Sequence, residues 1–393
     1  MAELTVRIAK RLADVSRADW DALAHGQSPF LEWDWLSSLE EAGCVRPERG
    51  WAAHHILVEQ DGRLVGACPV YLKGNSEGEF VFDHQWAYAA ERAGVAYYPK
   101  LLVGVPFTPA TGARFLYAAD HDRDALIRVM GGVLAQLCRD NGLSSVHVNF
   151  CLPEEREPLR DAGFVERVGM QYQWRNHGYA TFDDYLTEFK SKRRTKIRRE
   201  IREMADEGIT IRALSGADIG DDMAGTMFQL YQLHVNKLYW GRQYLNRAFF
   251  DLIVERFKRN LCFVVAEREG RVIAGTFNVQ KNGVFYGRYW GALEEVRHLH
   301  FNVCYYEAIR HCIDTGIQRF EPGAGGEFKQ LRGFDPAATY SMHHLSHPGL
   351  RQAVTDYLVE ERQHMDLVID RVTMDSKLRL VREGLAEGNP KPE

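Results

Sequence analysis

Residues 262–279 read CFVVAEREGRVIAGTFNV, two β-rich runs joined at Glu269-Gly270-Arg271. Residues 55–72, HILVEQDGRLVGACPVYL, repeat this pattern around Asp61-Gly62-Arg63. An acidic residue followed by glycine between two β-rich runs predicts an antiparallel hairpin. We therefore expect the same hairpin twice, roughly two hundred residues apart, which is a spacing typical of duplicated domains.

The segments that follow each hairpin also recur in one order. Each hairpin is followed by a helix that ends near a glycine, then by a short strand, and then by a Gly-Phe step. These features are expected at Asp124–Asn141, Ser145–Phe150 and Gly163-Phe164 in the first copy, and at Asn302–Asp314, Gln318–Glu321 and Gly333-Phe334 in the second. Repetition of several features in one order indicates a duplicated domain.

Each copy reads as strand, helices, hairpin with a further strand, helix and strand, which predicts an α/β protein with a mixed sheet. A strand is also expected over Glu79–Asp83. The order resembles the fold of the GCN5-related N-acetyltransferases (GNAT), which implies two tandem GNAT-like domains followed by C-terminal helices. The expected boundaries are 1–174 and 175–346 for the domains, 347–387 for a helical segment and 388–393 for a disordered tail.

The composition suits a globular chain with two cores: 393 residues, 45% hydrophobic, with a net charge of -5. We find no apolar run long enough to span a bilayer and no apolar signal at the N-terminus. The seven cysteines are scattered without a CxxC pair, so reduced thiols and no metal site are expected. These features predict a cytoplasmic protein and leave its oligomeric state open.

A glycine-rich stretch at residues 320–336, FEPGAGGEFKQLRGFDP, follows the last strand of the second copy. Backbone N–H groups at Gly325 and Gly326 can approach a ligand closely because glycine has no side chain. Lys329, beside this turn, can stabilise a developing oxyanion. The alternative is an ordinary surface loop, and the position of the stretch within the repeat favours a functional role.

A basic segment, KSKRRTKIRREIR at residues 190–202, stands between the two copies. Ile197, Ile201 and Met204 are spaced to bury one side of a helix, which leaves cations on the others. A helix before it is expected to start at Thr181, whose hydroxyl suits an N-cap. The basic helix is either a solvated charged surface or a site for a phosphate-bearing ligand.

The GNAT pyrophosphate loop has no clear counterpart here. In acetyl-CoA-dependent GNAT proteins a glycine-rich loop precedes the central helix and binds the pyrophosphate with backbone N–H groups. Residues 297–302 occupy that position in the second copy without a glycine, and residues 105–114 of the first copy contain two prolines, which lack an N–H. This argues against acetyl-CoA as the donor.

Several stretches together resemble the FemABX-like superfamily, and the chain is most similar to its bacterial FemAB-like branch of peptidoglycan biosynthesis or recognition proteins. The resemblance covers nearly the full length. It is carried by Ser28–Cys44, Tyr97–Gly112, Ser191–Arg199, Lys237–Phe250, Gly287–Gly291 and Gly323–Pro336.

The resemblance implies an aminoacyltransferase that takes its donor group from aminoacyl-tRNA and transfers it to an amine of a peptidoglycan precursor, without another cofactor. A Phe-Lys pair before a Gly-Phe step is expected in the cleft, and Phe328 and Lys329 match it. Gln330-Leu331-Arg332 stands between the pair and Gly333, which departs from the family's usual spacing.

Further residues are expected to assist the reaction. Glu327 is a candidate general base, with Glu321 as the alternative, and Arg288 is expected to line the cleft. The cations expected to contact phosphates are Lys192, Arg193, Arg194 and Arg199. Two other functions remain open, an acyl-CoA-dependent N-acyltransferase and a non-catalytic protein that recognises peptidoglycan or another amine-bearing ligand.

Overall fold

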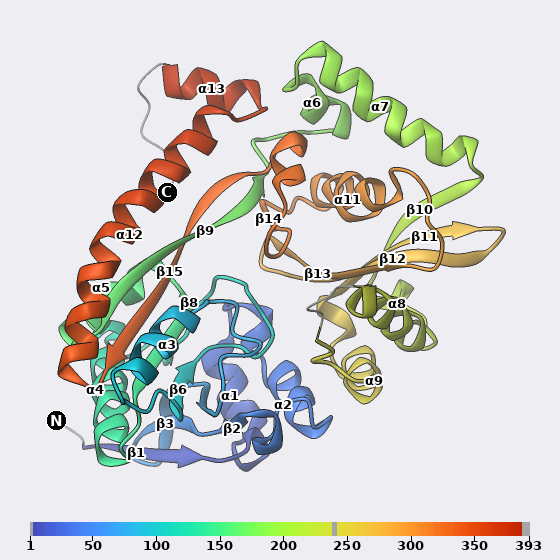
Figure 1. Cartoon of the computed structure of the whole chain (residues 1–393). Coiled ribbons are helices and arrows are strands. Elements are labelled where there is room, and N and C mark those ends of the chain that lie inside the picture. The colour runs from blue at the N-terminus through green and yellow to red at the C-terminus, as the bar shows by residue number, and fades with distance from the viewer. Residues whose placement is uncertain (1–2, 238–241, 387–393) are drawn as a thin grey trace. The chain divides into compact units, whose positions relative to one another are not determined.

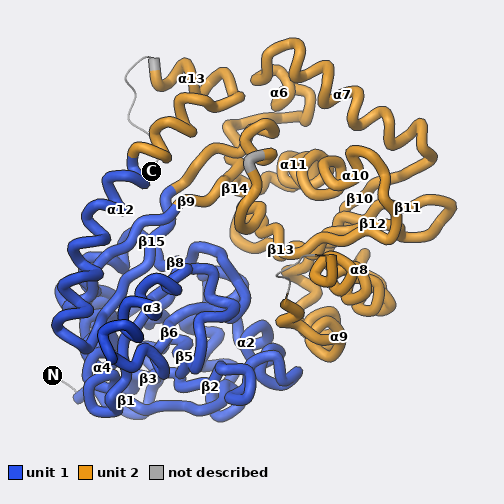
Figure 2. The backbone as a smooth tube through the Cα atoms, viewed as in Figure 1, with its two compact units in different colours: residues 1–169, 338–366 blue, residues 170–337, 367–393 orange. Residues whose placement is uncertain are grey.

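The computed structural model describes residues 3–237 and 242–386 (Figure 1). The chain divides into two compact units, residues 1–169 with 338–366 and residues 170–337 with 367–393 (Figure 2). The tail expected at residues 388–393 lies outside the described residues, as do residues 238–241 of the stretch Lys237–Phe250. Within the described ranges, no helix is both long and apolar enough to cross a bilayer.

The first unit contains a sheet ordered β1-β3-β4-β7 and a run of strands ordered β15-β8-β6-β5-β2. Its strands are β1 (Leu4–Ala9), β2 (Trp51–Ala53), β3 (His55–Gln60), β4 (Arg63–Cys68), β5 (Val70–Lys73), β6 (Lys100–Val103), β7 (Leu116–Tyr117) and β8 (Ser145–Cys151). Its helices are α1 (Arg17–Ala24), α2 (Trp33–Glu41), α3 (His84–Arg92), α4 (Arg123–Asp140) and α5 (Arg156–Asp161).

The second unit contains strands in the order β10-β11-β12-β13-β14-β9. Its strands are β10 (Ile209–Ser215), β11 (Leu261–Arg268), β12 (Arg271–Lys281), β13 (Val284–Ala292) and β14 (Arg319–Glu321). Its helices are α6 (Phe182–Thr187), α7 (Ser191–Asp206), α8 (Met223–Lys237), α9 (Arg247–Arg256), α10 (Leu299–Phe301), α11 (Glu307–Asp314) and α13 (Arg379–Ala386). In this unit α8 and α11 lie on opposite faces of the sheet (Figure 1).

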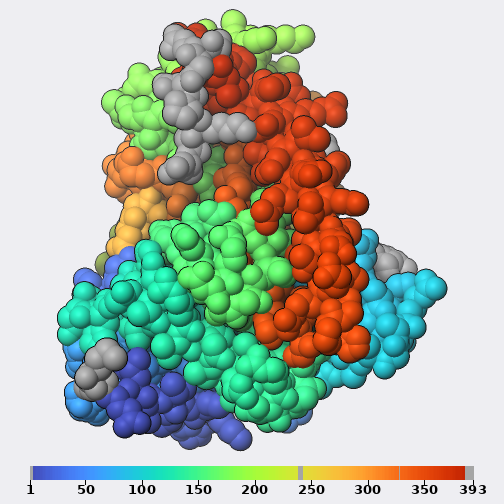
Figure 3. All heavy atoms as spheres, turned by 90° about the vertical axis from the view of Figure 1, so that its left-hand side faces the viewer, coloured from blue at the N-terminus to red at the C-terminus, as the bar shows by residue number. Residues whose placement is uncertain are grey.

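Three elements contain a boundary between the units. They are β9 (Val165–Arg175), β15 (Asp335–Leu345) and α12 (Pro348–Met374). The first half of α12 buries Leu350, Val354 and Leu358 in a cluster with Trp86 of α3. Its other side is part of the molecular surface, drawn in orange-red in Figure 3.

Both predicted hairpins are present. β3 pairs with β4 and β11 with β12, each in antiparallel register across the acidic-Gly step. The two turn residues have positive φ in each case, 52° and 78° at Asp61 and Gly62, and 51° and 73° at Glu269 and Gly270. Two successive left-handed residues match the twist of paired strands, which is why this dipeptide closes a tight hairpin.

Each unit also contains a parallel strand pair joined by a helix. β6 pairs with β8 across α4, and β13 pairs with β14 across α10 and α11. In the second unit a π-helical turn, η7 (Asn302–Tyr306), lies between α10 and α11, within the helix predicted at Asn302–Asp314. The repeated order of strand, helices, hairpin, strand, helix and strand confirms the predicted mixed α/β fold with tandem GNAT-like domains.

Candidate functional site

The candidate site of the second unit begins where β13 and β14 separate. The two strands pair only from Val284↔Arg319 to Tyr286↔Glu321, after which β13 continues and β14 ends. The glycine-rich turn follows β14 and remains close to β13, because a Cβ on Gly323 would lie 3.2 Å from the carbonyl oxygen of Gly287. Glycine suits this position, because a side chain would be tight against β13 and strained by the φ of 81°.

Arg288 lies in a bulge of β13 at this point. Tyr289 pairs with Phe277 and Gly287 with Asn278, so the register passes over Arg288. Burial lowers the pKa of its guanidinium, whereas Tyr289 and Glu321 act in the opposite direction. The structure thus brings two residues of the sequence hypothesis, Arg288 and Glu321, together beside the separating strands.

Lys329 fixes the glycine-rich turn from within. It belongs to the 3-10 helix η8 (Glu327–Arg332) and is buried, and its Nζ donates hydrogen bonds to the carbonyl oxygens of Gly323 at 2.6 Å and Ala324 at 3.2 Å. Burial lowers the pKa of Lys329 to about 8. Since an ammonium group has three donors, these two bonds leave one for another acceptor.

Three other predicted residues of this loop, Gly325, Gly326 and Phe328, are exposed. Gly325 and Gly326 have φ of 71° and 92°, and the Phe328 ring is 59% exposed, with its centroid 6.0 Å from that of Phe301. The side chain of Glu327 lies outside the described residues, so only its backbone in η8 is placed. Among the predicted catalytic residues whose side chains the structure describes, Lys329 is buried and Phe328 is exposed.

A buried cluster of Glu200, Tyr306 and Arg332 connects the basic helix α7 to this loop. Tyr306 donates to the Glu200 carboxylate, and Arg332 Nη2 lies 3.6 Å from it. Arg332 also stacks over Phe301, with its Cζ 3.4 Å from the ring centroid, and donates to the carbonyl of Phe328 at 2.9 Å. The basic segment therefore contains one acidic side chain that faces inward and holds η8 in place.

The four predicted phosphate-binding cations of α7 are not equivalent. Lys192 and Arg199 are exposed, although Arg199 also lies 3.4 Å from Glu203, and Arg194 is half-buried. Arg193 is half-buried and its Nε donates to the carbonyl of Leu331 at 2.8 Å, so it supports η8. Lys192, Arg194 and Arg199 are the members of this set that reach solvent without a bond to the loop.

A cavity of about 270 Å³ lies beside this loop at the end of β13. Trp290 and His300 form part of its wall, with ring centroids 4.5 Å apart. Burial, together with the nearby positive charges of Arg332 and Lys329, lowers the pKa of His300 to about 4. The sequence hypothesis did not include His300; its place in HLHFN, before the second repeated helix, was the only signal.

The corresponding position of the first unit is filled by its own chain. Beyond Val103 the loop to β7 bonds to β8, with Gly112 N donating to Phe150 O at 3.1 Å. The buried Arg114 donates from Nε to Asn149 O and from its other nitrogens to the carbonyl oxygens of Ala110, Gly112 and Ala113. The two prolines noted in the sequence belong to this filled loop.

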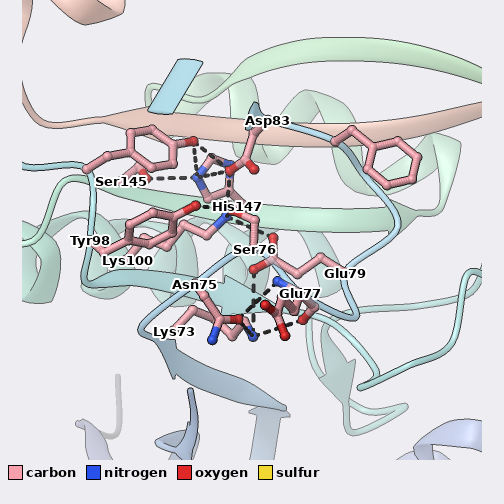
Figure 4. Close-up of polar contacts among 12 residues, drawn as sticks. Lys73, Asn75, Ser76, Glu77, Glu79, Asp83, Tyr98, Lys100, Ser145 and His147 are labelled. Atoms are coloured by element: carbon pink, nitrogen blue, oxygen red, sulfur yellow. Dashed lines mark hydrogen bonds and ion pairs between the residues drawn. The ribbon is translucent and has the colours of Figure 1, made fainter. Parts of the chain in front are cut away.

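The first unit instead contains a buried charge cluster around Lys100 (Figure 4). Lys100 Nζ donates to Glu79 at 2.8 Å, Asp83 at 2.5 Å and Ser76 at 2.8 Å. The strand predicted over Glu79–Asp83 is wrong: the segment is an irregular loop, since its carboxylates turn inward to neutralise Lys100 and Lys73. Lys73 also lies 3.5 Å from the centroid of Trp51.

Two histidines extend this cluster. His147 Nδ1 and His343 Nδ1 lie 2.6 Å apart, so one must donate while the other accepts. Burial lowers the pKa of His147 to about 3 and that of His343 well below its usual value. All of these side chains are buried, so the cluster anchors the loop at residues 74–83 and offers no surface to a substrate.

The exposed and buried groups of the second unit define what the site can do. A lysine held against a glycine turn can supply positive charge to a developing oxyanion, and the neighbouring cavity has room for an uncharged group. In the described part of the chain, no three His, Cys, Asp or Glu side chains gather in a way that could hold a metal ion.

Solved structures with the same fold include proteins of known name. FemX matches with a TM-score of 0.53 and 11% identity over 87% of this chain and 98% of its own. The C-terminal domain of a putative lysylphosphatidylglycerol synthetase from Agrobacterium fabrum matches with a TM-score of 0.53 and 12% identity over 88% of this chain and 97% of its own. L-PGS from Bacillus licheniformis matches with a TM-score of 0.52 and 11% identity over 88% of this chain and 96% of its own. Identities this low show a shared fold.

Two comparisons concern the sequence itself. None of the curated protein sequences compared with the chain matches it. The family model of FemAB-like proteins, described as peptidoglycan biosynthesis/recognition, matches residues 11–379. Because this match extends over nearly the whole chain, and the fold is shared with FemX, the protein belongs to the FemAB-like family.

Proposed function

We propose that the protein is an aminoacyltransferase that moves an activated aminoacyl group from aminoacyl-tRNA to an amine of a peptidoglycan precursor. The observation that carries the proposal is Lys329, buried and bonded to a glycine turn at the point where β13 and β14 separate. Family membership and the fold shared with FemX and with lysylphosphatidylglycerol synthetase, whose named product carries an amino acid, support the same reaction class.

The reaction requires little from the protein besides position and charge, because an aminoacyl ester is already activated. The acceptor amine attacks the ester carbonyl carbon and forms a tetrahedral oxyanion. The ammonium of Lys329 and the N–H groups of Gly325 and Gly326 stabilise that oxygen. The C–O bond to the ribose then breaks, an amide forms, and the proton lost by the amine passes to the ribose hydroxyl.

Proton removal from the amine falls to a carboxylate near the separated strands. Glu321 is buried at the end of β14 and interacts electrostatically with Arg288. We assign it as the general base in preference to Glu327. Phe328, exposed at the start of η8, offers its ring to the donor or the acceptor.

Charge at two places favours tRNA over acyl-CoA as the donor. The loop before α10, where a pyrophosphate would bind, brings Glu294 and Glu295 to the cavity, and the Lys237 ammonium there lies 3.1 Å from Glu295. A pyrophosphate is repelled by these carboxylates. Lys192, Arg194 and Arg199 on α7 instead offer positive charge to a polynucleotide backbone.

The test compares donors directly. The purified protein is given a peptidoglycan precursor peptide with radiolabelled aminoacyl-tRNA or with acetyl-CoA, and amide formation is measured. We expect transfer from the tRNA ester, its loss in Lys329→Ala, and full activity in Lys281→Ala, a lysine of the same unit at the far end of the β12–β13 hairpin. Transfer from acetyl-CoA alone, or tight precursor binding without transfer from any donor, overturns the proposal.

A further inference from the structure

The cavity beside Lys329 has a volume of about 270 Å³ and lies entirely within the second unit. It is formed by the end of α8, the end of β13, the loop that follows and α10. The described residues that line it are Leu233, His234, Lys237, Trp290, Gly291, Ala292, Glu294, Glu295, Val296, His298, Leu299, His300 and Phe301.

The inner wall of this cavity is apolar and aromatic. Trp290 lies between His300, at 4.5 Å between ring centroids, and His234, at 6.2 Å. Burial lowers the pKa of both histidines, so both are neutral at pH 7. Leu233 and Phe301 complete a wall without net charge. Such a wall favours an apolar or aromatic group, since burying a charge there without a partner is costly.

The rim of the cavity is acidic. Glu294 lies 2.5 Å from Arg268, and Glu295 lies 3.1 Å from Lys237 but keeps 90% of its side chain exposed. Glu294 and Glu295 outnumber Lys237, the lysine of the described lining, and this excess of carboxylates favours an ammonium group over a phosphate or carboxylate. The cavity therefore suits both parts of an aminoacyl ester: the apolar wall suits its side chain, and the rim suits its free α-ammonium.

The cavity adjoins the residue assigned to the chemistry. The charge of Lys329 is close enough to lower the pKa of His300, and the rings of Phe301 and Phe328 lie 6.0 Å apart. A group held in the cavity is thus next to the turn that Lys329 stabilises. An acyl carbon bound near Lys329 would direct its own side chain toward His300 and Trp290.

We propose that this cavity binds the side chain of the transferred aminoacyl group, that it selects a large apolar or aromatic side chain, and that Glu295 attracts the α-ammonium. The inference rests on the proposed function and adds the class of amino acid that is transferred. A small side chain such as a methyl group would leave most of the cavity unfilled, and an unfilled apolar cavity loses packing energy.

The direct test is equilibrium binding of small esters, measured by calorimetry on the full-length protein. The probes are phenylalanine methyl ester, alanine methyl ester and methyl 3-phenylpropanoate, which has the aromatic ring but no amine. We expect phenylalanine methyl ester to bind at least about tenfold more tightly than alanine methyl ester, a difference of about 1.4 kcal/mol. Equal affinities overturn the inference.

Matched variants assign the two halves of the site. Leu233→Trp fills the cavity and should abolish binding of phenylalanine methyl ester, whereas Leu233→Ala enlarges it and should retain binding. Glu295→Gln should weaken the same ester about two- to fivefold, the range of an exposed ion pair, and leave methyl 3-phenylpropanoate unchanged. Glu269→Gln, an exposed glutamate in the β11–β12 turn, is the control and should change neither.

Binding and transfer separate this inference from the proposed function. Ester binding that Leu233→Trp abolishes, without transfer from any aminoacyl-tRNA, supports the cavity and overturns the proposed reaction. Transfer of alanine and phenylalanine at equal rates, unaffected by Leu233→Trp, overturns the cavity's role and supports the reaction. Binding of adenosine monophosphate in place of the esters assigns the aromatic wall to a nucleobase and overturns the inference.

Discussion

At the scale of single residues, Lys329 has a structural role in the glycine turn beside the chemical role that we propose for it. Two of its donors bond to the carbonyl oxygens of Gly323 and Ala324 in the glycine turn. A buried lysine usually loses its proton more readily because burial disfavours the charged form. The same burial makes its remaining charge more effective toward an oxyanion, since the surroundings screen it poorly.

The pKa of about 8 at Lys329 predicts the alkaline limb of the rate profile. In the proposed reaction the charged form is the active one, so kcat should fall as the pH rises through about 8. Lys329→Arg should move this fall beyond the measured range, because arginine stays charged. Lys329→Ala should lower kcat about 100-fold at pH 7, the cost of one oxyanion donor. A wild-type profile that is flat to pH 10 contradicts the assignment.

At the scale of elements, α8 and β13 approach one another so closely at Gly291 that a side chain is excluded. A Cβ at this position would lie 2.0 Å from the carbonyl oxygen of Leu230. Gly291 and Trp290 also line the cavity, so this contact positions the cavity wall as well as the helix.

Gly291→Ala should therefore destabilise the protein by about 3 kcal/mol, because the backbones must move apart. Thermal unfolding followed by circular dichroism measures the loss. Gly132→Ala in α4 is the control: nothing lies within 4 Å of its Cβ, and alanine favours a helix, so its stability should rise slightly. An unchanged melting temperature in Gly291→Ala would show that α8 is not held against β13 in this way.

Ionic contacts hold the loop at residues 74–83, whereas apolar packing holds the elements on either side of it. Lys100 is fully buried with Glu79 and Asp83, and burial raises the pKa of Glu79 to about 7. Removing one member of a buried ion cluster leaves the others unpaired in a poorly solvated site.

Lys100→Met should accordingly cost about 3–5 kcal/mol of unfolding free energy, measured by urea denaturation. The double variant Lys100→Met with Asp83→Asn should lose less than the sum of its single variants, since it also removes the unpaired carboxylate. Lys10→Met, at an exposed position of the same unit, is the control. Additive losses in the double variant would show that the two side chains do not interact.

At the scale of the whole molecule, the proposed use of tRNA requires a surface that attracts a polyanion, and the basic helix α7 is the candidate. The net charge of the chain is -5, so attraction to a nucleic acid must come from a local surface. On α7, Glu200 faces inward to Arg332 and Tyr306, which leaves the outward side rich in cations. Lys192, Arg194 and Arg199 are the members of the predicted set that reach this side.

Replacing Lys192 and Arg194 with glutamine should reduce the salt dependence of tRNA binding. Each lost phosphate contact lowers the slope of log K against log salt by about 0.7–0.9, so the double variant should lose about 1.5. Filter binding at several salt concentrations measures the slope. Arg212 on β10 forms an ion pair with Glu267 on β11, outside α7, and Arg212→Gln should leave the slope unchanged. A slope equal to that of the wild type contradicts a role for α7.

Local patterns in the sequence were sufficient for the hairpins, the repeat and the ends of several helices. Thr181 caps α6 as predicted, with its hydroxyl accepting from the backbone of Asp184. Ile197 and Met204 of the predicted stripe are buried on α7. These features depend on spacings of two to seven residues, within which side chains and backbone turns determine one another.

Only the tertiary structure decided which polar side chains face inward. Glu79 and Asp83, which were expected in a strand, form ion pairs with Lys100. Glu200 of the basic helix faces Arg332, and His300 packs against Trp290 in the cavity wall. Each of these choices depends on a partner outside the local pattern of its own segment, because a buried charge or hydrogen-bonding group is stable only when the fold supplies its partner. The sequence by itself thus determined the repeated framework, and long-range pairing decided the site.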